Sequence, residues 1–105
     1  MNQFKIFSLL TFLFLAISAC GDDTSVVESG TYTGTIQEVN AEETEIYVNL
    51  DDSGKVIELY FTDETTLTSD GEVVPFSTIQ VDDRVEVTVE KTGQRLDPVS
   101  VVLLN

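Results

Sequence analysis

The sequence predicts an all-β fold, a small barrel of five to seven strands with one short helical turn. From Gly30 onward, apolar and polar residues alternate in short runs, which is the period of a strand with one buried face. Turn-forming segments such as Asp51-Asp52-Ser53-Gly54 and Thr92-Gly93-Gln94 separate these runs. After Cys20 no segment keeps a helical period over about 10 residues, so a longer helix is not expected.

Alternation defines five main strands. They are expected at residues 31–39, 45–50, 55–62, 84–90 and 95–104. The second strand alternates most clearly, with Ile46, Val48 and Leu50 on one face and Tyr47 on the opposite, outward face. The third strand is rich enough in apolar residues to make contacts on both of its faces at one end. The inner face of the last strand is expected to hold Leu96, Val99, Val101 and Leu103, with Pro98 marking an edge or a bulge.

The segment between the third and fourth strands is irregular. A small hairpin is expected across the turn Ser69-Asp70-Gly71. Ser77 is a suitable N-cap for one helical turn over residues 78–81, because its hydroxyl can accept a hydrogen bond from a free N–H group of the first turn. Ile79 and Val81 are expected to point inward from this turn.

Residues 1–19 have the three parts of an export signal. Lys5 supplies the positive charge, residues 6–17 form an apolar stretch, and Ser18 and Ala19 are small enough for a peptidase to reach the next bond. The apolar stretch is too short for a spanning helix, which needs about 20 apolar residues. The sequence therefore predicts a cleaved signal peptide.

The junction Ile17-Ser18-Ala19-Cys20 resembles the lipobox of bacterial lipoproteins. The resemblance implies cleavage before Cys20, which would then carry acyl chains on its sulfur and its amino group. Two or three acyl chains attach a protein stably to a membrane. An ordinary signal peptide cut elsewhere, or an uncleaved N-terminal anchor, would instead leave Cys20 as a free thiol. Residues 20–29 are interpreted as the lipidated cysteine and an acidic tether, and residues 30–105 as the folded domain.

Residues 34–104 resemble the small OB-type domains of unknown function found in exported bacterial proteins. The matching segments are 34–36, 46–48, 59–62, 65–67, 76–81, 83–87 and 99–104. One departure is Asp82, which stands where the family pattern has glycine, so that turn can adopt a different backbone type. The resemblance implies an OB-like barrel and says almost nothing about activity.

The charge of the domain excludes one class of partner. All 19 acidic residues follow Cys20, where only four basic residues stand, so this part carries a formal charge of −15. Binding to phosphate backbones or anionic head groups depends on Lys and Arg. Nucleic acid is therefore not expected as a partner, and the membrane is expected to be reached only through the lipid on Cys20.

Catalysis and cofactors are not expected either. The chain has no histidine and one cysteine, so Ser-His-Asp triads, Cys-His pairs and His/Cys metal sites cannot form. The adjacent acid pairs Asp51/Asp52, Asp63/Glu64 and Asp82/Asp83 are expected at turns. Glycoside hydrolysis instead needs two carboxyl groups that converge across a cleft, roughly 5 to 9 Å apart.

Two kinds of binding residue remain. The acidic turns at Asp51, Asp52, Asp63 and Glu64 offer oxygen ligands of the kind that calcium prefers, although no EF-hand spacing is present and solvated turn acids are the simpler interpretation. Outward aromatic residues, Tyr47 above all, could form a binding face, although sheet packing would also account for them.

The sequence therefore favours a lipid-anchored, non-catalytic module of the cell envelope, on the exported side of the cell membrane or the outer membrane, that binds a protein or peptide. The alternative is a lipoprotein that binds a divalent cation such as calcium, or a glycan. Oligomeric state and partner identity stay open.

Overall fold

The computed structural model describes residues 24–104 as one seven-stranded β-sheet with a single short 3₁₀ turn. The strands and the turn are β1 (Gly30–Asn40), β2 (Glu45–Leu50), β3 (Val56–Tyr60), β4 (Thr66–Ser69), β5 (Glu72–Val73), η3 (Phe76–Thr78), β6 (Arg84–Thr92) and β7 (Arg95–Leu103). The all-β prediction is confirmed. Within this part of the chain there is no helix long and apolar enough to cross a membrane.

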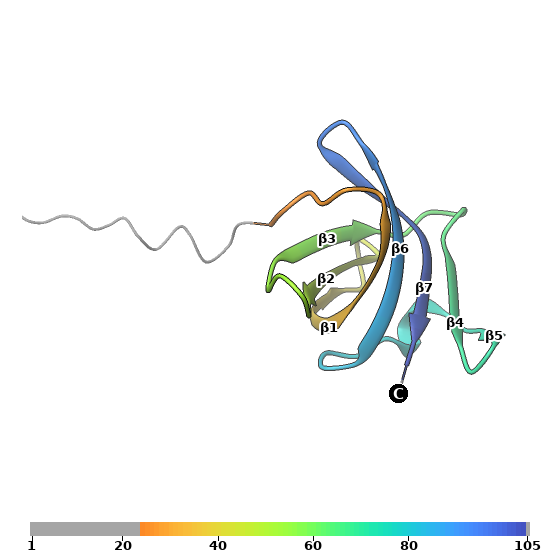
Figure 1. Cartoon of the computed structure of the whole chain (residues 1–105). Coiled ribbons are helices and arrows are strands. Elements are labelled where there is room, and N and C mark those ends of the chain that lie inside the picture. Colours follow the sequence, from red (N-terminus) through yellow and green to blue (C-terminus); the bar gives the residue numbers. More distant parts are fainter. Residues whose placement is uncertain (1–23, 105) are drawn as a thin grey trace, which may run out of the picture.

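The sheet curls into a barrel. Its strand order is β3-β2-β1-β6-β7-β4-β5, and every pairing is antiparallel except that of β4 with β7. β3 and β7 are separated by three strands in this order and are nevertheless in contact, so the curled sheet brings them together (Figure 1). β1 lies between β2 and β6 in the sheet, and β4 makes a short parallel pairing with β7, the last strand. This is the OB-like arrangement that the sequence predicts.

The interior of the barrel is filled by aliphatic side chains from alternate positions of the strands. The buried apolar residues are Ile36, Ile46, Val48, Leu50, Ile57, Leu59, Leu67, Ile79, Val85, Val87, Val89, Leu96, Val101 and Leu103. Branched aliphatic residues suit this role because they pack well on a pleated surface. All of these residues lie between Ile36 and Leu103, so the chain from residue 21 onward contains the whole core.

The last strand differs from the prediction at one place. The pairing of β6 with β7 shifts register between Thr88 and Val89, which face Ser100 and Pro98 respectively, so Val99 is the extra residue of a β-bulge. Pro98 consequently points inward, and Val99 is 40% exposed. The bulge changes the side-chain phase, so the expectation that Val99 shares the inner face is wrong.

The short helical turn also differs from the prediction. It begins at Phe76 after Pro75, not after Ser77, and it ends at Thr78 because Ile79 is already extended. Proline fixes an extended φ of −75° at the start of this turn. Ile79 is buried as expected, whereas Val81 is 52% exposed, because the chain reverses at Asp82, whose φ is +79°.

Candidate functional site

The outer face of the β2–β3 hairpin carries a compact group of polar and aromatic side chains. In the register of this hairpin Glu45 faces Tyr60 and Tyr47 faces Glu58. Ile46 and Val48 occupy the alternate positions and fill the core, so these four side chains share the opposite face. We call Glu45, Tyr47, Glu58 and Tyr60 the tyrosine–glutamate cluster.

Within this cluster the two carboxylates are diagonal neighbours across the strands, a separation that long side chains can bridge. The Tyr47 hydroxyl donates to Glu58 Oε2 over 3.5 Å. Tyr60 is 47% exposed, whereas Glu45 is only 4% exposed. Among residues 24–104 the Glu45 Oε2 atom has no hydrogen-bond partner. An acidic side chain is therefore covered on the outside of the barrel, under a face that solvent and ligands can reach.

The carboxyl and phenol groups of the cluster shift one another's protonation. Sharing a hydrogen bond with Glu58 raises the pKa of the Glu45 carboxyl, with burial as the second cause. The same hydrogen bond lowers the pKa of Glu58. Burial and the neighbouring Glu58 charge raise the pKa of Tyr47 to about 12, and hydrogen bonding to Glu58 raises the pKa of Tyr60. Both tyrosines therefore remain protonated donors at neutral pH.

A second candidate surface lies where β3 ends and the β4–β5 hairpin begins. Phe61 and Phe76 meet there edge to face, with ring centroids 5.0 Å apart and an interplanar angle of 86°. They line a hollow of about 440 Å³ together with Leu67, Val73 and Val74. Threonine hydroxyls and Asp63 also line it. We call this space the Phe61–Phe76 hollow.

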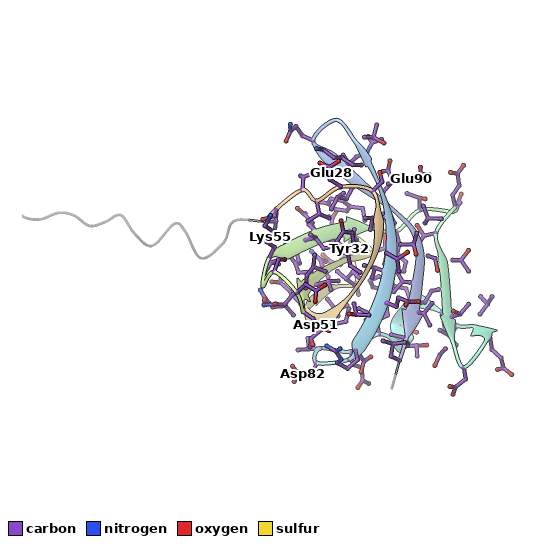
Figure 2. All side chains as sticks on the ribbon, in the orientation of Figure 1. Glu28, Tyr32, Asp51, Lys55, Asp82 and Glu90 are labelled. Atoms are coloured by element: carbon purple, nitrogen blue, oxygen red, sulfur yellow. The ribbon has the colours of Figure 1, made fainter. Side chains whose placement is uncertain are left out.

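The acidic turns that the sequence offers as possible calcium ligands lie in different surroundings. Asp51 accepts two hydrogen bonds from Arg84, at 2.8 and 2.7 Å, and a third from the Thr33 hydroxyl. The guanidinium holds the pKa of Asp51 below its ordinary value. Figure 2 shows Asp51 near Asp82, with which it lines a shallow pocket. The Asp51 carboxylate is therefore already paired with the Arg84 guanidinium.

The remaining acidic candidates stay apart. Asp52 precedes β3, whereas Asp63 and Glu64 follow it, so the two turns lie at opposite ends of that strand. All three residues are exposed. Among residues 24–104 no group of three or more acidic, histidine or cysteine side chains is arranged to hold a metal ion.

The predicted lipidation site lies outside the described residues. Cys20 and the cleavage-site residues Ile17, Ser18 and Ala19 precede residue 24, where the description begins. Their role stays a prediction from the sequence.

Glu45 and Glu58 are the site residues that sequence reasoning missed. Once the turn at residues 51–54 fixes the register of the hairpin, both residues fall on the same outward face as Tyr47. The outward position of both residues could therefore be predicted from the sequence. The burial of Glu45 could not, because it depends on how the neighbouring side chains cover it.

Comparison with known proteins gives the fold alone. No protein family and no curated protein matches the sequence. Among solved structures, a copper(II) form of a CusF variant from Escherichia coli is 13% identical, with a TM-score of 0.59 over 74% of this chain and 94% of that one. The silver(I) form of CusF from the same organism is 13% identical, with a TM-score of 0.59 over 77% and 98%. Metal-free CusF is also 13% identical, with a TM-score of 0.57 over 74% of this chain and 89% of that one.

The barrel shared with CusF does not bring soft metal ligands with it. Copper(I) and silver(I) prefer sulfur and imidazole ligands. This chain has no histidine, its single methionine is Met1 and its single cysteine is Cys20. The described barrel therefore offers oxygen ligands in place of sulfur and imidazole.

Proposed function

We propose that this protein is a bacterial cell-envelope lipoprotein, held on the exported side of a membrane by lipid on Cys20, and that its barrel is a non-catalytic module that binds a protein or peptide. The lipobox-like junction supports the anchor. The absence of histidine from the chain supports a non-catalytic role, because most triad and metal-hydrolase chemistry needs it.

The single observation that carries the peptide-binding proposal is the free edge beside the Phe61–Phe76 hollow. β5 is the last strand in the sheet order, so one side of its backbone has no strand partner among residues 24–104. Val73 on this edge is 78% exposed and also lines the hollow. A free strand edge next to an apolar hollow suits an added peptide strand, because the backbone supplies hydrogen bonds and the hollow accepts a side chain.

Site-specific cross-linking tests this proposal in the native envelope. A photoreactive residue replaces Val73 in the full-length protein, and Val81 is replaced in a matched control, because both are exposed valines on different surfaces. We expect one discrete adduct from position 73 and none from position 81. The substitution Val73→Asp should abolish the interaction with the cross-linked partner, whereas Val81→Asp should preserve it.

Equal labelling from both positions would contradict the proposal, as would no adduct from either one. Equal labelling would mean that the partner does not distinguish the β5 edge from the rest of the barrel.

A second candidate function is favoured by the tyrosine–glutamate cluster. There the half-exposed ring of Tyr60 lies beside paired carboxylates, an arrangement that suits a small ligand such as a divalent cation or a glycan.

A further inference from the structure

We propose that Glu45 and Glu58 together bind a hard divalent cation of the calcium class on the outer face of the β2–β3 hairpin. The proposal specifies the ligand of the second candidate function. It can be tested separately from peptide binding at β5, because none of the four side chains of the tyrosine–glutamate cluster lines the Phe61–Phe76 hollow.

The placement of the two carboxyl groups supports this proposal. The strand register holds Glu45 and Glu58 on one face as diagonal neighbours, a separation that long side chains can bridge. Two ionised carboxylates at this separation repel each other unless a proton or a cation lies between them. A divalent cation at this position would take the place of the shared proton and neutralise both charges.

The second argument is the covered oxygen of Glu45. Although the side chain is 4% exposed, its Oε2 atom has no hydrogen-bond partner among the described residues. Leaving a buried acceptor unsatisfied is unfavourable, and the penalty is larger for a charged group. A cation held between Glu45 and Glu58 would give this oxygen a partner.

The third argument concerns the basic side chains of residues 24–104. Three of the four form ion pairs with other carboxylates: Arg84 with Asp51, Lys91 with Glu28 and Arg95 with Asp97. The fourth, Lys55, lines a pocket near the tether, and Figure 2 shows it there. Arg95 lines a pocket together with Glu58 and Tyr60, but its guanidinium is paired with Asp97. A cation from solution can therefore supply positive charge to Glu45 and Glu58, since the strongly negative domain concentrates cations.

The ligand atoms indicate the class of cation. The cluster offers carboxylate oxygens, which suit calcium and magnesium, and no sulfur or imidazole. Tyr47 and Tyr60 remain protonated at neutral pH, so they orient the carboxylates by donating hydrogen bonds. Two carboxylates provide at most four ligand oxygens, and water completes the shell. We therefore expect a Kd of about 10⁻⁴ to 10⁻³ M, typical of extracellular calcium modules.

Terbium luminescence tests the location of the ion. Terbium(III) replaces calcium and emits when a nearby tyrosine is excited, and this chain has three tyrosines and no tryptophan. In the fragment 21–105 we expect sensitised emission that calcium displaces. Tyr47→Phe combined with Tyr60→Phe should remove the emission. Tyr32→Phe should preserve it, because the Tyr32 hydroxyl is bonded to the Glu28 carbonyl near the tether.

Thermal melting tests the ligands. At 10 mM calcium we expect Tm of the wild-type fragment to rise by about 5 °C or more relative to sodium chloride of equal ionic strength. Glu45→Gln and Glu58→Gln should each weaken calcium binding at least about tenfold. Glu64→Gln removes one charge from an exposed position after β3 and should leave binding unchanged within about twofold.

Three results would overturn the proposal. The first is a wild-type fragment whose Tm does not respond to calcium, since a proton shared by Glu45 and Glu58 would then be enough to relieve the repulsion between them. The second is a Glu64→Gln variant as impaired as Glu45→Gln, which would show diffuse charge screening. The third is emission that depends on Tyr32. None of these results bears on cross-linking at Val73, so the two proposals fail separately.

Discussion

Gly34 shows how one residue can fix the packing of two strands. It lies on β1 opposite Leu50, and a Cβ atom at this position would stand 2.5 Å from the Asn49 carbonyl oxygen and 2.7 Å from Val48 Cγ1. Real Cβ atoms do not approach backbone this closely, so β2 would have to move. The glycine is needed for close approach of the strands.

We therefore predict that Gly34→Ala lowers the free energy of unfolding by about 1–3 kcal/mol, the usual range for an overpacked core position. Urea denaturation of the fragment 21–105 measures this change. Gly34→Val should cost more, because its added methyl groups meet the same atoms. An alanine variant as stable as the wild type would show that β2 yields without strain.

Asp82 supports a prediction of the opposite sign. Its φ of +79° lies in the left-handed region, where a Cβ atom is unfavourable and glycine is preferred. We expect Asp82→Gly to stabilise the domain by about 0.5–1 kcal/mol, since strain relief exceeds the added freedom of the unfolded chain.

Asp83→Gly is the matched control for Asp82→Gly. Asp83 is not in the left-handed region, and its carboxylate accepts a hydrogen bond from the Gln80 N–H at 2.9 Å. This variant should be destabilised in the same thermal melt. A melt in which Asp82→Gly lowers Tm would mean that the carboxylate at position 82 contributes more than the backbone strain costs.

At the scale of elements, alternation was sufficient to locate the strands. The pattern over residues 45–50 coincides with β2, and the buried phase of Val85, Val87 and Val89 is as expected. The errors arose where a tertiary contact alters a local period. The bulge at Val99 depends on its pairing with β6, and the start of η3 depends on Pro75.

The candidate site was predictable only in part. The outward position of Tyr47 follows from the alternation of β2, and the positions of Glu45 and Glu58 follow from the hairpin register. The state of Asp51 does not follow from local sequence, because its partner Arg84 is 33 residues away and reaches it across β1, which pairs with both β2 and β6. Ion pairs between distant elements are not encoded in any local pattern.

The Asp51–Arg84 pair joins the turn after β2 to the start of β6 and gives a prediction about pH. Arg84 holds the folded-state pKa of Asp51 below its ordinary value of about 3.9. The pair therefore contributes stability above about pH 4, and this contribution is lost as the pH falls through the depressed pKa. Because both side chains are partly exposed, solvent screens the pair and its contribution to stability is small.

Asp51→Asn should accordingly lower Tm at pH 7 by no more than a few degrees, because the ion pair is exposed to solvent. The difference in Tm between the wild type and the variant should become smaller as the pH falls below about 4. Melting curves from pH 2.5 to 7 measure it. A Tm difference that stays constant across this pH range would show that the charge of the Asp51 carboxylate is not what stabilises the turn.

At the scale of the whole molecule, the barrel fold is shared with other proteins, whereas the residues on it differ. The fold is similar to that of CusF, yet this chain lacks sulfur and imidazole ligands in its barrel and carries a formal charge of −15 after Cys20. The same scaffold can support unrelated functions, since function depends on the residues placed on it. The proposed anchor and the two proposed binding surfaces therefore each need a test of their own.

The measurement that tests the central claim most directly is intact-mass and fragment mass spectrometry of the protein purified from its native envelope. The account predicts a chain that begins at Cys20, with a diacylglyceryl group on its sulfur and an acyl group on its amino nitrogen. A free thiol at Cys20, or a chain that still includes residues 1–19, would contradict it.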